Sequence, residues 1–524
     1  MRMSTDESRD EELALETIAA AAGAGVTVFD TARAYGDNER LVARALRRCG
    51  ADTTARIVTK GGMARPDGAW VPDGRAKSIL ADCEASLAAL DGLPIDLYLI
   101  HAPDPRTPWR TSVRALVRLA DQGLVRHVGL SNVNRRELDE ALELAPVAAV
   151  QVALSPFDDR AIRGGLLERC DELGIALLAH SPLGGPKRAG RVDAGETLAW
   201  LLGLSRVVVP IPGARRPETA RAAAGIAAIA PAPALHRRRR SAPARVDVDV
   251  VLVMGVPGAG KSRVAADYAT RGYLRLNRDE RGGSLRQLAA VLGKELSSGT
   301  RQVVLDNTYL TRAARNDVIE EAGRHGAPVR CVWLDTPLAQ AQVNLVERLL
   351  DRFGALPTPA ELRTLAKLEP GLLAPTSQMR AFRELEPPSI DEGFSGIEHV
   401  LFERTPSQGR PGVFVAAAAL ADSGWEHGTR DAPHLVYDWN PDGSSAALDE
   451  AVARLAGEVS GQVEGALCPH AAGPPTCWCR PPLPGLPLAF ARAHGVDPSR
   501  SVLVGNGPAH KTLANALGAR YIPV

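Results

Sequence analysis

Residues 250–262 read VVLVMGVPGAGKS, a sequence in which an apolar run leads into closely spaced glycines. The run predicts a buried strand, and the residues after Lys261 predict a helix. A strand, a glycine-rich turn and a helix N-terminus in this order present several backbone N–H groups to one phosphate. We therefore expect an ATP site in which Lys261 reaches the β- and γ-phosphates and Ser262 holds Mg²⁺. The glycines of this loop are Gly255, Gly258 and Gly260.

Further motifs on the C-terminal side narrow this site to one class of kinases. Asn-Arg-Asp at 277–279, VVLDNT at 303–308, and a strand with an arginine-bearing helix over 329–352 follow the loop in turn. Together they resemble the 5′-hydroxyl polynucleotide kinases, and the resemblance runs from about residue 248 to residue 404. It implies that Asp279 takes the proton of the attacking 5′-hydroxyl at a nucleic-acid end.

The chemistry of phosphoryl transfer agrees with these residues. In-line transfer needs a carboxylate beside the nucleophile, a metal ion, and cations around the γ-phosphoryl oxygens. Arg348 and Arg352 lie one helical turn apart and are the expected cations, and Arg315 is a further candidate. The alternatives are a helix N-cap for Asp279 and a solvated helix face for Arg348 and Arg352.

The length of 524 residues predicts about three domains. We expect a barrel over 1–230, a linker rich in proline and arginine over 231–247, the kinase-like domain over 248–408, and a third domain over 409–524. The kinase motifs end near residue 404, so a chain cut there is expected to keep the kinase. The boundaries follow from motif positions and from the composition of the linker.

Charge and cysteine usage restrict the partners and the compartment. The net charge of +1 gives no overall field that attracts nucleic acid, so a polynucleotide would need a local basic surface. No apolar run is long enough for a membrane span, and the start of the chain is charged. Scattered cysteines with one tight cluster fit a reducing compartment. We expect a cytoplasmic protein without a membrane partner.

Residues 1–230 alternate short apolar strands with alanine- and leucine-rich helices. Seven such units predict parallel strands in an α/β barrel of the (β/α)8 type. Polar residues stand at the carboxyl ends of several strands, which is where barrel active sites lie. The expected strands span residues 26–30, 56–60, 97–101, 125–131, 147–154, 176–181 and 207–211.

Five segments of this domain resemble the aldo-keto reductases: GVTVFDTARAYGDNE from 25, IVTKGG from 57, DLYLIHAPDP from 96, GLSNVN from 129 and LAHSPLGG from 178. The resemblance implies four catalytic residues, Asp30, Tyr35, Lys60 and His101. Hydride arriving at a carbonyl carbon leaves an alkoxide that must be protonated, and Tyr35 is the expected acid. Asp30 would keep Lys60 charged beside it, and His101 would orient the carbonyl oxygen. Taken singly, a loop tyrosine or a strand-end histidine is more often structural.

The same resemblance implies NADPH as the cofactor. Ser131, Asn132 and Gln151 match the positions that contact the nicotinamide carboxamide, and Arg215 and Arg216 suit a 2′-phosphate.

Three departures from the reductase pattern weaken this expectation. The usual first strand is reduced to the stub 1–5, so an incomplete barrel is expected. Leu154 stands where a tyrosine commonly stacks on the nicotinamide. The usual contacts to the adenosine end are replaced by Thr219, Ala222 and Ala223, which puts cofactor affinity in doubt.

The third domain begins near residue 410 and contains CPHAAGPPTCWC at 468–479. It resembles the zinc-bearing histidinol-phosphatase branch of the haloacid-dehalogenase (HAD) superfamily, which implies a Rossmann-like fold. The ligand types and spacing fit a closed, structural Zn²⁺ site, and chance clustering is the alternative. The expected ligands are Cys468, His470, Cys477 and Cys479.

The catalytic groups of that superfamily are missing from this sequence. Ala416 and Ala418 occupy the positions of the aspartate nucleophile and its partner, and Asn506 and His510 replace the late Mg²⁺ ligands. Without a nucleophile no aspartyl phosphate forms, so the domain is expected to lack phosphatase activity.

The favoured function is an ATP-dependent kinase of 5′-hydroxyl polynucleotide ends fused to an NADPH-dependent reductase of a small carbonyl substrate, in nucleic-acid repair. One alternative is a kinase and reductase acting on small metabolites. The other is a scaffold that binds nucleotide and NADPH. The phosphoryl acceptor, the carbonyl substrate and the oligomeric state stay open.

Overall fold

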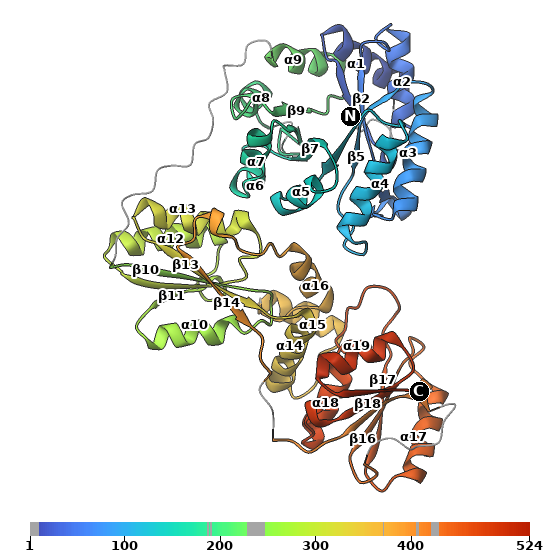
Figure 1. The fold of residues 1–524 in the computed structure, drawn as a ribbon, viewed down its shortest axis with the longest axis vertical. Coiled ribbons are helices and arrows are strands. Elements are labelled where there is room, and N and C mark those ends of the chain that lie inside the picture. The colour runs from blue at the N-terminus through green and yellow to red at the C-terminus, as the bar shows by residue number, and fades with distance from the viewer. Residues whose placement is uncertain are drawn as a thin grey trace. The chain divides into compact units, whose positions relative to one another are not determined.

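The computed structural model describes residues 10–185, 188, 191–227, 247–369, 371–404, 408–420 and 429–524. The chain forms two compact units, Met1–Arg239 and Arg240–Val524, and each is described by itself (Figure 1). The stub 1–5 lies outside the described residues, as does the predicted linker except for Asp247. No helix in the described ranges is both long and apolar enough to span a bilayer.

The N-terminal unit contains a seven-stranded parallel sheet in the order β1-β2-β5-β6-β7-β8-β9, with helices outside it (Figure 1). Its strands are β1 Val28–Asp30, β2 Arg56–Gly61, β5 Ile95–Ile100, β6 His127–Ser131, β7 Val147–Ala153, β8 Ala176–His180 and β9 Val208–Pro210. Its helices are α1 Glu11–Gly23, α2 Asn38–Arg48, α3 Ala76–Leu90, α4 Trp109–Asp121, α5 Arg135–Leu142, α6 Arg160–Arg163, α7 Leu166–Leu173, α8 Ala194–Leu202 and α9 Pro217–Ala227. All seven predicted strands are present, with ends shifted by one or two residues.

The predicted shortening of the barrel is visible in the sheet. Among the described residues, β1 pairs only with β2 and β9 pairs only with β8, so the curled sheet has two edges. Val28 and Val209 on these edge strands are 39% and 37% exposed. Helix α1, before the first strand, nevertheless contacts α9, after the last strand.

The two faces of this sheet have different roles. A large core fills the space between strands and helices, while Val58, Leu99, Ala149 and Leu178 form a separate cluster. Val58 and Lys60 are two residues apart in β2, so their side chains leave the same face. The smaller cluster therefore lies beneath the polar groups of the site.

The first part of the C-terminal unit is a parallel sheet in the order β11-β12-β10-β13-β14. Strand β10 lies at its centre, with α10 on one face and α12 and α13 on the other (Figure 1). Its strands are β10 Asp249–Met254, β11 Leu274–Leu276, β12 Gln302–Asp306, β13 Val329–Asp335 and β14 Gly396–Leu401. Its helices are α10 Lys261–Thr270, α11 Arg278–Arg281, α12 Leu285–Ser297, α13 Arg312–Arg324, α14 Leu338–Phe353, α15 Pro359–Leu368 and α16 Pro375–Glu384.

The second part of this unit is another parallel sheet, in the order β17-β16-β15-β18-β19. Its strands are β15 Val413–Ala416, β16 His434–Trp439, β17 Val463–Cys468, β18 Val502–Gly505 and β19 Arg520–Pro523, and its helices are α17 Ala446–Glu458, α18 Gly485–His494 and α19 Pro508–Leu517. Strand β15 lies at the centre of this parallel sheet, and the HAD-type assignment stays a prediction.

One hydrophobic core crosses the predicted boundary at 408/409. Val346 and Leu349 of α14 are buried in the same cluster as Phe414 and Leu488. Helix α14 lies against α18 and α19 (Figure 1). The two parts are therefore packed together, which the motif positions did not predict.

Candidate functional sites

The four predicted reductase residues come together at the carboxyl ends of neighbouring strands. Asp30 ends β1, Lys60 lies near the end of β2, and His101 directly follows β5. Tyr35 closes a short 3-10 turn, Arg33–Tyr35, that follows β1. Because β1, β2 and β5 are adjacent in the sheet, their ends bring these side chains to one place.

A buried ion pair is the centre of this arrangement. The Nζ of Lys60 donates to Oδ1 of Asp30 at 2.6 Å and to the carbonyl of Thr31 at 2.7 Å, and the Lys60 side chain is fully buried. It lies 5.4 Å from the ring centroid of Tyr35, whose ring meets that of His101 edge-on at 5.7 Å. Burial by itself raises the pKa of Asp30, but the Lys60 charge and the hydrogen bonds from Lys60 and Gln151 together hold the pKa below its usual value. The ammonium thus lies beside the phenol with its counter-ion in place.

Trp70, which the sequence analysis did not single out, lies beside the rings of Tyr35 and His101. Trp70 precedes the second strand of a small hairpin, β3 Met63–Ala64 and β4 Val71–Pro72. Its ring lies 6.0 Å from that of Tyr35 and 5.7 Å from that of His101, and it is 41% exposed. A half-exposed indole beside the rings of Tyr35 and His101 suits the apolar part of a substrate. The only available signal was a lone tryptophan in the loop after the lysine strand.

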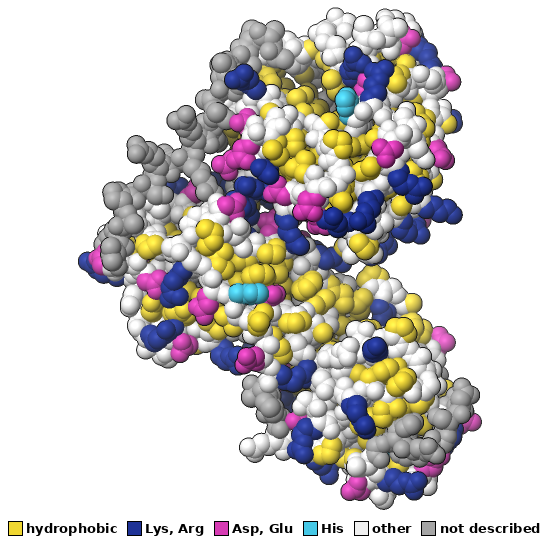
Figure 2. All heavy atoms as spheres, in the orientation of Figure 1, with side chains coloured by type: hydrophobic (Ala, Val, Ile, Leu, Met, Phe, Trp, Pro, Cys, Tyr) yellow, Lys and Arg dark blue, Asp and Glu magenta, His cyan; other side chains and the backbone are white. Residues whose placement is uncertain are grey.

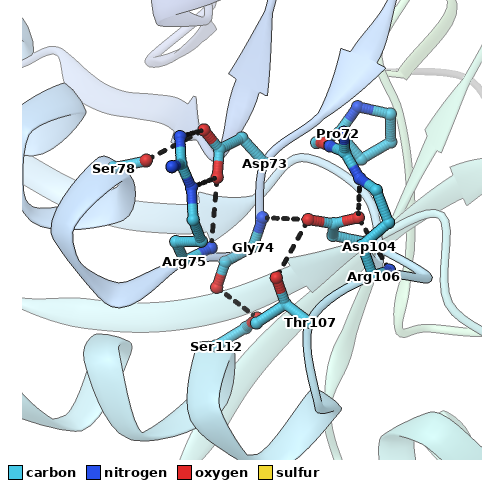
Figure 3. Close-up of polar contacts among 9 residues, drawn as sticks. All are labelled: Pro72, Asp73, Gly74, Arg75, Ser78, Asp104, Arg106, Thr107 and Ser112. Carbon is cyan, nitrogen blue, oxygen red and sulfur yellow. Dashed lines mark hydrogen bonds and ion pairs between the residues drawn. The ribbon is translucent and has the colours of Figure 1, made fainter. Parts of the chain in front are cut away.

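Hydrogen bonds around Asp104 anchor the end of this hairpin (Figure 3). The Asp104 carboxylate accepts from the N–H of Gly74 and the hydroxyl of Thr107, both at 3.0 Å, and from Nε of Arg106 at 3.1 Å. The hydroxyl of Ser112 donates to the carbonyl of Gly74 at 2.6 Å. A Cβ at position 74 would lie 2.6 Å from the Ser112 Oγ, so this close approach requires glycine. The loop after β5 therefore fixes the position of the hairpin.

The proposed nicotinamide contacts lie next to the Lys60–Asp30 pair and His101. Ser131 is buried at the end of β6 and Gln151 is buried within β7, and Nε2 of Gln151 donates to Oδ1 of Asp30 at 2.8 Å. Asn132 adopts a left-handed backbone conformation, and its Nδ2 donates to the His101 carbonyl at 2.9 Å. Gln151 is thus hydrogen-bonded to the Lys60–Asp30 pair, and Asn132 is hydrogen-bonded to the backbone of His101.

The remaining cofactor positions differ in exposure. Leu154 is fully buried in the large core of the unit, so it offers no surface for a nicotinamide ring. Arg215 and Arg216 are exposed in the segment before α9. Their position leaves them accessible to an anionic group of a bound dinucleotide.

The glycine-rich loop has the backbone of a phosphate cradle. Gly258 and Gly260 have φ values of 88° and 93°, in the left-handed region, and Gly255 has a φ of 153°. The Nζ of Lys261 donates to the Val256 carbonyl at 2.9 Å. Ser262 follows in the first turn of α10 and is exposed, as a metal ligand in this position would be. The strand, loop and helix order predicted for a P-loop is confirmed.

Burial dominates the electrostatics of this lysine. It lowers the pKa of Lys261 to about 8, and the Arg348 charge lowers it further, while Asp306 and Asp279 act in the opposite direction. Arg348, Asp306 and Asp279 are therefore close enough to Lys261 to shift its pKa. The two carboxylates and the two cations lie around the glycine-rich loop.

Asp279 is not the cap of its helix. The N-cap of α11 is Asn277, whose Oδ1 accepts from the N–H groups of Asp279 at 2.7 Å and Glu280 at 3.3 Å. The Asp279 side chain is 44% exposed and has the guanidinium of Arg278 at 3.4 Å. The N-cap alternative is therefore wrong, and the carboxylate is accessible to an acceptor.

Asp306 is a second carboxylate at this site, which the sequence interpretation did not assign. It ends β12, next to Val253 of the P-loop strand, and its side chain is 2% exposed. It pairs with Arg275 and accepts from Nδ2 of Asn277 at 3.1 Å. An acidic residue that closes the apolar strand beside a P-loop is positioned to orient Mg²⁺ and its water ligands. In the sequence, this residue is marked by the run QVVLD at 302–306, an apolar strand that ends in an aspartate.

The three arginine candidates have different environments. Arg348 is exposed on α14, and its charge acts on Lys261. Arg352 pairs with Glu369 at 2.5 Å. Arg315 is fully buried in a two-point ion pair with Glu392, at 2.8 and 2.7 Å. The prediction that Arg315 contacts the phosphoryl group is therefore wrong, because its guanidinium is buried and bound to Glu392.

The predicted metal ligands form a compact cluster. The ligand atoms of Cys468, His470, Cys477 and Cys479 all lie within 4.8 Å of one another. The sulfurs of Cys468 and Cys477 are 3.7 Å apart, and those of Cys479 and Cys468 are 3.3 Å apart. Tetrahedral Zn–S bonds of about 2.3 Å place sulfurs about 3.7 Å apart, so the residues fit a Zn²⁺ ion.

The positions predicted from the resemblance for the aspartate nucleophile and its partner hold alanines. Ala416 ends β15, and Ala418 lies in the turn that follows. Nδ2 of Asn506 donates to the Ala418 carbonyl at 3.3 Å, and its N–H lies 3.2 Å from Nδ1 of His510. Neither alanine has a side chain that could form an aspartyl phosphate.

The surface carries both signs of charge. Figure 2 shows basic and acidic side chains interspersed over the face that it draws. This agrees with the net charge of +1.

Two protein families match parts of the chain. Residues 1–197 match the Aldo/keto reductase family, and residues 250–369 match a family described as AAA domain. The second match covers the P-loop, the carboxylates of Asp279 and Asp306, and all of α14 and α15.

Curated relatives and a solved structure resemble the N-terminal unit. Aldo-keto reductase str7 of Strobilurus tenacellus is 36% identical over 180 residues, which cover 34% of this chain and 52% of the relative. The uncharacterized oxidoreductase C215.11c of Schizosaccharomyces pombe is 30% identical over 224 residues, which cover 40% of this chain and 72% of the relative. A crystal structure of an aldo-keto reductase from Klebsiella pneumoniae in complex with NADPH is 25% identical, with 42% of this chain and 81% of that chain covered and a TM-score of 0.36.

The chain spans about half the length of the Strobilurus relative and nearly three quarters of the Schizosaccharomyces relative. The matched residues include the β1, β2 and β5 strand ends with the buried Lys60–Asp30 pair. Through its N-terminal unit, the chain belongs to the aldo/keto reductase family.

Proposed function

We propose that the N-terminal unit reduces the carbonyl group of a small molecule with NADPH. The observation that carries this proposal is the fully buried Lys60–Asp30 pair next to the rings of Tyr35 and His101. NADPH would supply the hydride. Tyr35 would protonate the developing alkoxide, Lys60 would favour that negative charge, and His101 would orient the carbonyl oxygen.

Replacement of the acid tests this role. Tyr35→Phe should lower kcat for a panel of aldehydes and ketones by about 10²- to 10⁴-fold with little change in NADPH affinity, since the hydroxyl acts only as hydride arrives. NADPH binding is measured by fluorescence titration, and turnover by loss of NADPH absorbance. Undiminished turnover in Tyr35→Phe would move the acid elsewhere, and a wild-type protein that binds no NADPH would indicate a vestigial barrel.

We further propose that the P-loop part transfers the γ-phosphoryl group of ATP to the 5′-hydroxyl of a nucleic-acid end. Lys261 and Ser262 would hold the nucleotide and Mg²⁺, with Asp306 behind the metal. The exposed carboxylate of Asp279, free of a capping role, is the group that would accept the proton of the hydroxyl. Arg348 would add positive charge near the transferred group, and the pairing with Glu369 leaves Arg352 a weaker candidate.

A single comparison tests the assigned base and the acceptor class together. Asp279→Ala should abolish transfer from labelled ATP to 5′-hydroxyl oligonucleotides while ATP binding persists. Glu280→Ala removes the next carboxylate, which pairs with Arg275 at 3.1 Å, and should keep most of the activity. Transfer to small hydroxylated metabolites but not to oligonucleotides would favour the metabolite kinase. ATP binding without transfer to either class would favour the scaffold.

For the C-terminal part we propose a Zn²⁺ ion on the Cys₃His cluster and no phosphatase activity. Metal analysis should find about one zinc per chain, and Cys477→Ser should lose it. Phosphate release from 3′-phosphorylated ends that survives the Lys261→Ala change would contradict the second half of this proposal. A shared role of the two active units in nucleic-acid repair is proposed from their presence in one chain.

A further inference from the structure

The loop that carries the cysteine cluster reaches into the P-loop part of the C-terminal unit. Trp478 lies between Cys477 and Cys479 and is 1% exposed, in the same hydrophobic core as α14. Its indole Nε1 donates to the carbonyl of Leu373 at 3.0 Å. Leu373 lies between α15 and α16, two residues before α16 begins. The cluster loop therefore holds the start of α16.

Helix α16 in turn holds the glycine-rich loop. Nε2 of Gln378, a fully buried residue of α16, donates to the carbonyl of Pro257 at 2.8 Å. From α14, Nδ2 of Asn344 donates to the carbonyl of the next residue, Gly258, at 2.8 Å. A P-loop binds phosphate through N–H groups that converge on the ligand, which requires its carbonyls to point away. The two amides fix two successive peptide groups in that orientation.

We propose that Trp478 is a positioning residue for the nucleotide site. It fixes the segment before α16, and Gln378 passes that constraint to the Pro257 carbonyl, so the metal-cluster loop and the phosphate-binding loop are coupled. The inference rests on the proposed binding of ATP. Another hydrogen bond between the two parts acts on a different element: Nε2 of Gln340 in α14 donates to the carbonyl of Ala516 in α19 at 2.6 Å. Met379 of α16 also packs against the shared core, and the indole of Trp478 adds a directional hydrogen bond to the segment before that helix.

Trp478→Phe tests the proposal because it removes the indole donor and keeps an aromatic ring. The matched control is Trp439→Phe. Trp439, the last residue of β16, also contacts the cluster loop, since its Nε1 donates to the carbonyl of His470 at 2.8 Å. This contact is near the start of the loop, whereas Trp478 is near its end. Both variants should retain about one zinc per chain. Trp478→Phe should raise the ATP dissociation constant about three- to thirtyfold, while Trp439→Phe leaves it within twofold of wild type.

Hydrogen exchange without nucleotide gives a second readout. In Trp478→Phe the amides of residues 255–262 should exchange faster than in wild type and in Trp439→Phe. In a Gln378→Ala background, which already breaks the link, Trp478→Phe should add little to either measurement. Wild-type affinity and exchange in Trp478→Phe, or equal effects of both tryptophan changes, would overturn the proposal. A wild-type chain that binds no ATP would instead refute the kinase function, and the exchange comparison would still decide the coupling.

Discussion

At the scale of single residues, the half-buried Lys261 makes nucleotide binding sensitive to pH. Burial lowers the pKa of Lys261 to about 8 in the free protein, and a bound triphosphate would raise it again because it favours the charged form. Binding therefore requires a proton once the pH exceeds about 8. ATP affinity should be constant below that pH and fall above it, by at most about tenfold per pH unit.

Equilibrium titration of ATP between pH 7 and pH 10 measures this effect. Lys261→Arg keeps a cation that does not titrate in this range, so its profile should be flat. A wild-type affinity that does not change up to pH 10 would show that the Lys261 charge plays no part in binding.

The sequence predicted the residues that belong to strand-end motifs and missed those that depend on distant contacts. Asp30, Lys60 and His101 follow apolar strands, so their convergence could be inferred from the barrel pattern alone. Trp70 belongs to a hairpin whose place is set by tertiary hydrogen bonds. Arg315 looked available in sequence, but its partner Glu392 lies 77 residues away.

At the scale of elements, the buried carboxylate of Asp104 is one anchor of the end of the β3–β4 hairpin. Burial by itself raises the pKa of Asp104, but hydrogen bonds from Arg106, Gly74 and Thr107 hold it below its usual value. A depressed carboxyl pKa contributes stability above the unfolded pKa, and this contribution is lost as the pH falls through the folded value. The anchor is therefore intact at neutral pH and weakens only in acid.

Asp104→Asn should loosen the hairpin and with it the Trp70 side of the substrate site. Hydrogen bonds to a charged group contribute about 1.5–3 kcal/mol each to stability, and the amide retains only part of that. We expect KM for the carbonyl substrate to rise several-fold, faster hydrogen exchange over residues 62–75, and unchanged NADPH affinity. Asp91→Asn is the control, since that side chain is 80% exposed in a surface ion pair. Unchanged KM and exchange in Asp104→Asn would remove the hairpin from substrate binding.

Element order was predictable where hydrophobic period and loop chemistry agree. The seven strands of the first unit and the strand, loop and helix around Lys261 appear as expected. The partners of α14 were not predictable, because an apolar helix face does not say which surface covers it. In the structure that face packs against elements more than 60 residues further along the chain.

At the scale of the whole molecule, the two units differ in how they can be divided. The N-terminal unit has a core of its own. The P-loop part has a core on each face of its sheet and shares a further core with residues after 408. A chain that ends near Arg404 would expose apolar residues of α14 such as Val346 and Leu349, which are at most 1% exposed in the full chain. It would also leave Gln340 without the Ala516 carbonyl. The kinase motifs alone predict an independent domain, and this packing argues against it.

Fragments that end on either side of the shared core test this division. Residues 240–404 should be recovered mainly as aggregate, because contiguous exposed apolar surface drives association, whereas residues 240–524 should be monodisperse and bind ATP. Residues 1–230 serve as the control, since their core needs nothing from the rest of the chain, and should show cooperative thermal unfolding alone. Size-exclusion chromatography with light scattering distinguishes these outcomes. If residues 240–404 were monodisperse and bound ATP as tightly as the full chain, the cysteine-bearing part would be a separable domain, and its contacts with α14 and α16 would contribute nothing to the nucleotide site.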